Sequence, residues 1–171
     1  MAEDPSSPPP DRALGDELGA QDLTTIFETV EFADAYRISY LANAVVTPGY
    51  DAVKREYGVI RGEYLLLCCL SHYPVLTAQD VATISRRPRN TISRAVHRML
   101  AEGYIERAPD PDDGRQSRLT ITPAGRALHG KIAAMLAERQ ETVLGGLGEE
   151  ERATLSALLL KAARHAATLD E

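Results

Sequence analysis

Residues 77–103 read TAQDVATISRRPRNTISRAVHRMLAEG and predict two short helices joined by a tight turn. Thr77 is a suitable N-cap, and Asp80 follows three residues later, where a capping box places its acidic residue. The second helix begins at Asn90 or just before it. Its apolar positions recur at helical spacing until Gly103, a residue type that is common just after a helix end. Two such helices, the second with arginines on its outer face, are typical of a helix-turn-helix.

The pattern changes from helical to alternating after Gly103. Residues 104–108 and 117–122 alternate as strands do, and the turn-rich residues 109–114 lie between them. A β-hairpin is therefore predicted directly after the helix pair.

Long helices are predicted on the C-terminal side of this hairpin. Thr122 and Pro123 supply an N-cap and a first-turn proline to a helix that we expect to end near Leu144. The glycine-rich residues 145–148 separate it from a last helix that begins at Glu149, where three consecutive glutamates suit the positive end of the helix dipole.

Helices are also predicted on the N-terminal side. Residues 61–73 are apolar almost all round, so this helix should lie in the middle of the domain. From Asp22 onward, apolar residues at helical spacing predict a long first helix that stops or kinks at Pro48, where Thr47 caps a short helix ending near Tyr57. The fold class is therefore mainly α with one small β-hairpin.

The length and composition are those of one globular domain. The chain has 171 residues, of which 44% are hydrophobic and 26% are charged. Residues 1–21 are rich in proline and acidic residues and read as a disordered arm outside the fold. The longest apolar run, residues 64–70, is far shorter than the roughly 20 residues that cross a bilayer. We therefore expect a cytoplasmic protein with no membrane partner.

Charge is distributed unevenly along the chain. The net charge is −6, but residues 1–34 hold nine acidic residues and one basic residue, whereas residues 86–98 hold five arginines and no acidic residue. A phosphate backbone responds to the surface that it meets rather than to the total charge. The segment 86–98 therefore favours a nucleic-acid partner in spite of the acidic total.

The hairpin and the residues just after it carry an acidic residue, an arginine, two apolar positions, a threonine and a glycine, namely Asp113, Arg115, Leu119, Ile121, Thr122 and Gly125. In type and spacing this set resembles the wing pattern of the MarR family of bacterial transcription regulators. The resemblance extends by element order over roughly residues 22–169. It implies a single domain over 22–171, in which residues 61–122 form a winged helix-turn-helix and residues 22–57 and 123–171 form dimerisation helices. Arg86 and Arg87 depart from it, because relatives commonly have a glycine and an apolar residue there.

The first turn of the second helix suits DNA reading, because asparagine and arginine make paired hydrogen bonds to base edges in the major groove. The candidates there are Asn90, Thr91, Ser93 and Arg94. Arg98 lies one turn further and either joins them or pairs with Glu102. Phosphate contacts are expected from Arg86, Arg87 and Arg89 in the turn and from Arg118 in the hairpin. The resemblance implies that Arg115 enters the minor groove and that Asp113 orients it.

The resemblance also implies a mode of regulation. Members of the family act as homodimers on pseudo-palindromic double-stranded DNA, and a small aromatic or anionic effector releases a repressor from its operator. The candidate effector residues are Tyr40, Arg61, Tyr64 and His72, although Tyr64 also reads as core and Arg61 as a surface residue. The stretch YGVIRGE at 57–63 suggests regulators of aromatic-acid or nicotinate catabolism.

Other classes of function have weaker support. The four histidines show no paired ligand spacing, so no metal or other cofactor is expected, and Cys68 and Cys69 read as small core residues rather than oxidant sensors. No nucleophile or acid–base motif indicates an enzyme. The alternative from another class is an interaction scaffold that keeps the winged helix but binds protein instead of DNA.

Overall fold

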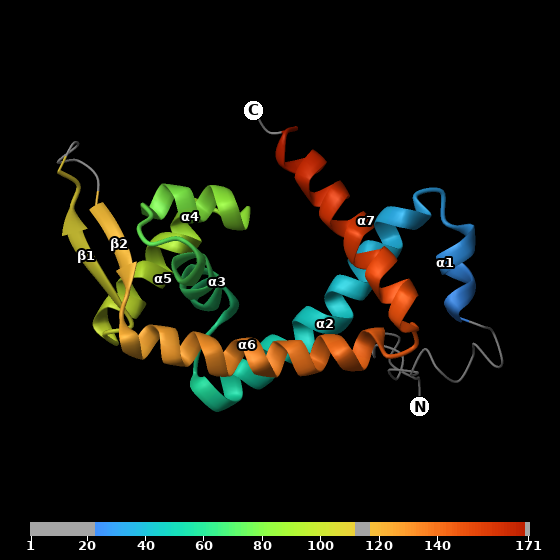
Figure 1. Cartoon of the computed structure of the whole chain (residues 1–171), viewed down its shortest axis with the longest axis horizontal. Coiled ribbons are helices and arrows are strands. Elements are labelled where there is room, and N and C mark those ends of the chain that lie inside the picture. Colours follow the sequence, from blue (N-terminus) through green and yellow to red (C-terminus); the bar gives the residue numbers. More distant parts are fainter. Residues whose placement is uncertain (1–22, 112–116, 170–171) are drawn as a thin grey trace, which may run out of the picture. The chain divides into compact units, whose positions relative to one another are not determined.

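The computed structural model describes residues 23–111 and 117–169 (Figure 1). The predicted arm at 1–21 and the wing residues Asp113 and Arg115 lie outside the described residues. Contacts divide the chain into two units, one up to Tyr40 and one from Leu41 onward. The boundary falls inside the long helix α2, Ala33–Tyr57.

The described part of the first unit contains a short 3-10 turn at Leu23–Thr25, helix α1 at Ile26–Thr29 and the start of α2. The expectation of one unbroken helix from Asp22 is wrong, because the chain turns between α1 and α2. Aromatic packing favours this turn: the Phe27 ring lies 4.7 Å from that of Tyr40 and 6.0 Å from that of Tyr36. Arg37 Nε also donates to the Phe27 carbonyl oxygen at 2.8 Å.

The second unit follows the predicted order of elements. After the end of α2 come α3 (Arg61–His72), α4 (Ala78–Ser85), α5 (Arg89–Ala101), β1 (Ile105–Pro109), β2 (Ser117–Ile121), α6 (Pro123–Leu144) and α7 (Glu149–Ala167). The two strands pair antiparallel, with Ile105 opposite Ile121. The mainly α fold with one β-hairpin is therefore confirmed (Figure 1).

Local capping signals fix the helix-turn-helix. The Asp80 backbone N–H donates to Thr77 Oγ1 at 3.1 Å, and the Thr77 N–H donates to Asp80 Oδ2 at 2.8 Å, so the predicted capping box is confirmed. Helix α5 begins at Arg89, and Gly103 follows its end with a φ of +72°. Thr122 caps α6 in the same way, because its hydroxyl accepts from the Gly125 N–H at 3.1 Å.

The core of the winged helix gathers around α3, as its apolar sequence predicts. Leu66, Leu67 and Leu70 of α3 are fully buried together with Ile92 and Met99 of α5. Strand β2 adds Leu119, whose backbone also pairs with that of Leu76. The hairpin and helix α5 are thus held against one central helix.

Helix α2 continues through Pro48, so the expected stop and the cap at Thr47 are wrong. A proline inside a helix leaves the carbonyl four residues earlier without its usual donor. Here that carbonyl belongs to Ala44, and it accepts instead from Nε and Nη2 of Arg139 on α6 at 3.0 and 2.8 Å. A side chain from α6 therefore replaces the missing backbone bond, and the helix reaches Tyr57.

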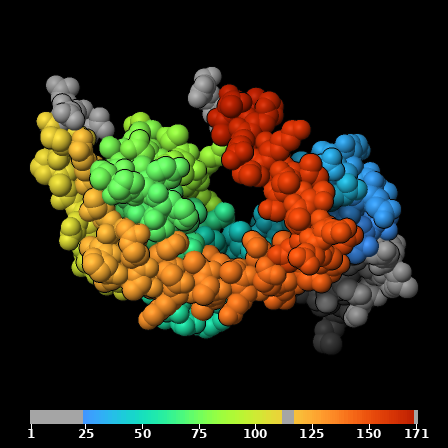
Figure 2. All heavy atoms as spheres, viewed as in Figure 1, coloured from blue at the N-terminus to red at the C-terminus, as the bar shows by residue number. Residues whose placement is uncertain are grey.

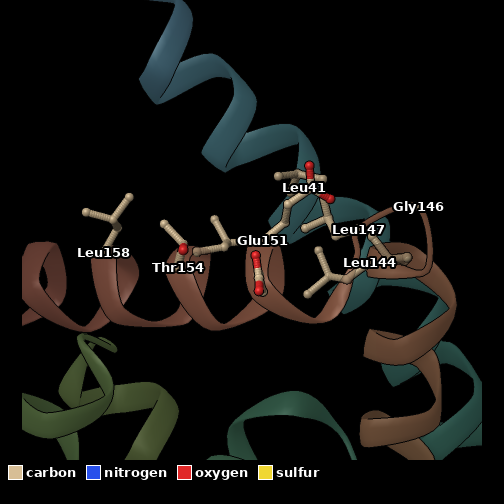
Figure 3. Close-up of a pocket in the computed structure, with 10 residues that line it drawn as sticks. Leu41, Leu144, Gly146, Leu147, Glu151, Thr154 and Leu158 are labelled. Carbon is tan, nitrogen blue, oxygen red and sulfur yellow. The ribbon is translucent and has the colours of Figure 1, made fainter.

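The last helix is poorly covered within one chain. Every residue of α7 is described, and none of them is buried; Leu158, Leu159 and Leu160 are 59%, 46% and 52% exposed. At the turn between α6 and α7, Leu41, Leu144 and Leu147 gather in an apolar groove of about 750 Å³, which Leu158 extends along α7 (Figure 3). Within 23–111 and 117–169, no helix is long and apolar enough to cross a membrane.

Candidate functional site

Helix α5, the second helix of the helix-turn-helix, separates its apolar and polar residues onto two sides. Ile92, Val96 and Met99 are buried. The exposed side carries Arg89, Asn90, Ser93, Arg94 and His97. Most of the residues predicted to read DNA therefore share one surface, which combines two arginines with an amide and a hydroxyl donor.

Thr91 occupies a different position from the other predicted DNA contacts. It is half-buried, and its Cγ2 would lie only 3.1 Å from a Cβ built on Gly62 of α3. This close approach places the Thr91 methyl group in the contact between α3 and α5. Sequence periodicity alone did not show this contact, because it depends on how the two helices cross.

Arg98 is used inside the domain. Its Nη1 donates to both carboxylate oxygens of Glu63 at 2.9 and 3.0 Å, and its Nη2 donates to the Gly58 carbonyl at 2.9 Å. Glu63 is only 3% exposed and also accepts from the Ile60 N–H at 2.8 Å. The acidic partner of Arg98 is therefore Glu63 and not Glu102, which the sequence offered as one of two alternatives, and the charge of Arg98 is neutralised at the start of α3.

The hairpin arginine Arg118 also has an acidic partner. Its Nε donates to Asp110 Oδ2 at 2.9 Å, and its Nη2 lies 3.3 Å from Asp110 Oδ1. This pair joins the beginning of β2 to the residue that follows β1. The predicted phosphate contact by Arg118 would have to compete with this bond.

The three turn arginines have different surroundings. Arg86 is exposed and its Nη2 donates to the Ala166 carbonyl of α7 at 2.6 Å. Arg87 is half-buried. Burial raises the pKa of the Tyr50 phenol of α2, and the charges of Arg61 and Arg87 oppose that shift. Arg89 is exposed on the α5 surface. Of the three, Arg89 is thus the one that shares the surface of the predicted base-reading residues.

A chain of rings connects α2, α3 and α6. The Arg61 guanidinium carbon lies 5.6 Å from the centre of the Tyr50 ring, and the Tyr50 and Tyr64 rings are 6.0 Å apart. Tyr64 stacks on His129 at 5.6 Å, and His129 meets His72 edge-on at 6.2 Å. We call these five residues the aromatic cluster.

The aromatic cluster contains three of the four predicted effector residues, namely Arg61, Tyr64 and His72. Tyr40 belongs to the first unit and is described there. Tyr50 and His129 were missed. Tyr50 was missed because a helix break was expected at Pro48, so the register that places Tyr50 on the same side as Val53 was not followed.

Burial in the cluster favours the uncharged forms of its two tyrosines and of His129. Burial raises the pKa of Tyr64 to about 12. Burial lowers the pKa of His129, and the neighbouring His72 and Arg126 lower it further. His129 Nδ1 is buried without a hydrogen-bond partner. A polar ligand atom at this place would therefore meet an unsatisfied ring nitrogen.

The adjacent cysteines face two different cores: Cys68 packs beside Tyr50 and Tyr64, and Cys69 packs in the core of the winged helix. Cys69 is buried, and burial raises the pKa of its thiol to about 11; burial also raises the pKa of Cys68. Both thiols are therefore held in the protonated, weakly nucleophilic form. In the described part of the chain, no three His, Cys, Asp or Glu side chains gather as a metal site would require.

Comparison with known proteins identifies the family that shares this helix-turn-helix and hairpin. The MarR family profile matches residues 61–117, from the start of α3 to the start of β2. The regulator YxaD of Bacillus subtilis, an uncharacterised HTH-type transcriptional regulator, is 31% identical over 106 residues, which are 62% of this chain and 74% of YxaD. The chain belongs to the MarR family. The predicted family membership is confirmed.

Solved structures of MarR family proteins share the fold. A MarR transcriptional regulator from Methanosarcina mazei aligns with a TM-score of 0.69 and 20% identity, covering 80% of this chain and 98% of that one. BpsR of Bordetella bronchiseptica aligns with a TM-score of 0.61 and 22% identity over 74% of this chain and 98% of its own. The structure of BpsR concerns regulation of its DNA binding by 6-hydroxynicotinic acid. The winged helix-turn-helix is thus the shared architecture of this MarR family chain and both solved proteins.

Proposed function

We propose that this MarR family chain is a cytoplasmic repressor that binds double-stranded DNA as a homodimer and leaves it when a small aromatic anion binds. The observation that carries the proposal is the exposed surface of α5. Arg89, Asn90, Ser93 and Arg94 lie there together, in a segment without a single acidic residue. Positive charge and base-edge donors are the two requirements for specific binding in a major groove.

Exposed apolar surface supports the homodimer. Leucines at three successive positions of α7 are about half-exposed, and together they span more than half of the helix circumference. The apolar groove at the α6–α7 turn adds to this surface (Figure 3). A second copy would bury both and would present two α5 helices to successive major grooves.

The aromatic cluster supports the class of effector. Arg61 beside Tyr50 offers a positive charge to a carboxylate, and Tyr50 and Tyr64 offer faces to an aromatic ring. The cluster joins α3 of the winged helix to α2 and α6, so a ligand there would change how these helices meet. The DNA binding of BpsR is regulated by 6-hydroxynicotinic acid. We therefore include hydroxylated nicotinates among the aromatic anions proposed as effectors.

DNA selection tests the first part of the proposal. Purified protein should enrich, from a pool of randomised duplexes, a site with two inverted half-sites about 10 base pairs apart. Absence of any enriched sequence would contradict the proposal. Binding of a protein partner through α5 would then favour the scaffold alternative, and turnover of an added aromatic acid would favour an enzyme.

Release from the selected duplex tests the effector. Benzoate and 6-hydroxynicotinate should compete with DNA binding, and Arg61→Met should require about tenfold more acid for the same release. Arg55→Met is the matched control, because Arg55 is an exposed arginine of α2. Equal release from both variants would remove Arg61 from the effector site.

A further inference from the structure

Arg86 has a backbone conformation that suits glycine. Its φ is +49°, and among the described residues it is the only one besides glycine with a positive φ. It follows the end of α4, where its N–H donates to the Thr83 carbonyl and the Arg87 N–H donates to the Ala82 carbonyl. A glycine would close this helix end without strain. What an arginine adds at this position is its side chain.

The Arg86 side chain reaches the end of α7. Its Nη2 donates to the Ala166 carbonyl oxygen at 2.6 Å, across 80 residues of sequence. Ala166 lies in the last turn of α7, where carbonyl groups have no donor within the helix and carry the negative end of its dipole. Ala166 also accepts backbone contacts from the Thr168 N–H at the helix end and from the Leu169 N–H, the latter at 3.4 Å. The guanidinium, at 2.6 Å, is the charged partner of this carbonyl.

This bond lies where α7 has little other support from the winged helix. Helix α6 leads away from the hairpin, and α7 runs back until its C-terminal end lies near α4 (Figure 1). Open space separates α7 from α3 and α4 along most of its length (Figure 2). The contact of Arg86 with Ala166 therefore joins the turn after α4 to the last turn of α7, two parts of the chain that are 80 residues apart.

We propose that Arg86 is a positioning residue that ties the turn of the helix-turn-helix to the C-terminal helix, rather than a phosphate contact. The bond fixes the turn before α5 relative to α7. Since α7 belongs to the proposed dimer surface, the bond also sets the direction in which α5 meets DNA. This last consequence rests on the proposed function, whereas the bond between the two elements does not.

Amide hydrogen exchange of the full chain without DNA tests the connection. Arg86→Gly keeps the turn conformation and removes the side chain, so amides of residues 163–169 should exchange about threefold faster while those of α3 stay unchanged. Arg86→Lys, which retains a charged donor, should restore part of the protection. Arg89→Ala is the control and should leave residues 163–169 unchanged. Unchanged exchange at 163–169 in Arg86→Gly would overturn the proposal.

Salt dependence on a random-sequence duplex separates positioning from phosphate contact. Arg86→Gly should keep the slope of log K against log salt, whereas each phosphate contact that is lost flattens it by about 0.9. A flattened slope for Arg86→Gly would identify Arg86 as a phosphate contact and overturn the proposal. If the wild-type chain binds no duplex, the proposed function fails, and the exchange experiment still decides the connection.

Discussion

The Arg98 guanidinium lies 2.9 Å from Glu63 Oε1 and joins the recognition helix to the first turn of α3. The Glu63 side chain is 4% exposed, whereas that of Arg98 is 43% exposed. Loss of the pair would therefore be more unfavourable for the buried carboxylate than for the partly exposed guanidinium. The second bond of Arg98, to the Gly58 carbonyl, extends the connection to the junction of α2 and α3.

Arg98→Ala should lower the free energy of unfolding by about 2 kcal/mol, because it leaves the buried Glu63 carboxylate unpaired; the exposure of Arg98 keeps the value below that of a fully buried pair. Urea denaturation measures it. Arg94→Ala, on the exposed side of the same helix, should change the free energy by less than about 0.5 kcal/mol. Equal stability of the two variants would show that the pair contributes nothing.

Arg139→Met should cost about 1–2 kcal/mol of stability, because it removes both donors from the Ala44 carbonyl. In a Pro48→Ala background, residue 48 regains its N–H and can donate to that carbonyl. The same Arg139 substitution should then cost at least about 0.5 kcal/mol less. A thermodynamic cycle of the four proteins provides the measurement, and strictly additive costs would refute the link between Pro48 and Arg139.

Protonation of His129 should lower the stability of the fold as the pH falls below about 6.5. Its folded-state pKa lies below the ordinary value of 6.5, because burial, His72 and Arg126 disfavour its charged form. The unfolded chain therefore binds more protons in this window, so the stabilisation is complete above pH 6.5 and is lost as the pH falls toward the folded-state pKa. His129→Gln should make the melting temperature less dependent on pH between 7 and about 5. His97→Gln, on the exposed side of α5, is the control and should keep the wild-type dependence.

Leu158→Asp should convert the proposed dimer into a monomer, because it places a charge on an apolar surface that a second copy would cover. Sedimentation velocity gives the mass in solution. Ile84→Asp is a matched control, since Ile84 is 47% exposed but lies on α4. Dissociation of the Ile84 variant, or a stable dimer of the Leu158 variant, would place the interface elsewhere.

Arg94→Ala and Arg115→Ala should each weaken binding to the selected duplex by about 1–3 kcal/mol without altering the mass in solution. Arg94→Ala should also relax the sequence preference at one base pair of each half-site, because it removes a major-groove contact. Fluorescence anisotropy on the selected duplex and its single-base variants measures both effects, with Lys161→Ala of α7 as a control. Wild-type affinity in both arginine variants would contradict the assigned surface.

Sequence alone predicted the elements whose signals are local. The Thr77–Asp80 capping box, the N-cap at Thr122 and the helix end before Gly103 depend on neighbours within a few residues. The continuation of α2 through Pro48 depends on Arg139, 95 positions from Ala44, so the sequence around Pro48 could not reveal it.

The candidate site also contains some residues that local sequence signals predict and others that depend on distant contacts. The exposed side of α5 followed from helical periodicity, and it carries four of the predicted residues. The partner of Arg98 was missed because Glu63 lies 35 positions away. His129 and Tyr50 were missed because rings from three helices meet only after those helices pack.

Helix α6 is a lever arm. Its 22 residues give it a length of about 33 Å, with the winged helix at one end and the apolar groove of the α6–α7 turn at the other. A rotation of only about 6° about the groove end would carry the hairpin end through about 3.4 Å, which equals the rise of one base pair. In the proposed complex with DNA, a small rotation at the groove end would thus displace the winged helix by about one base-pair step.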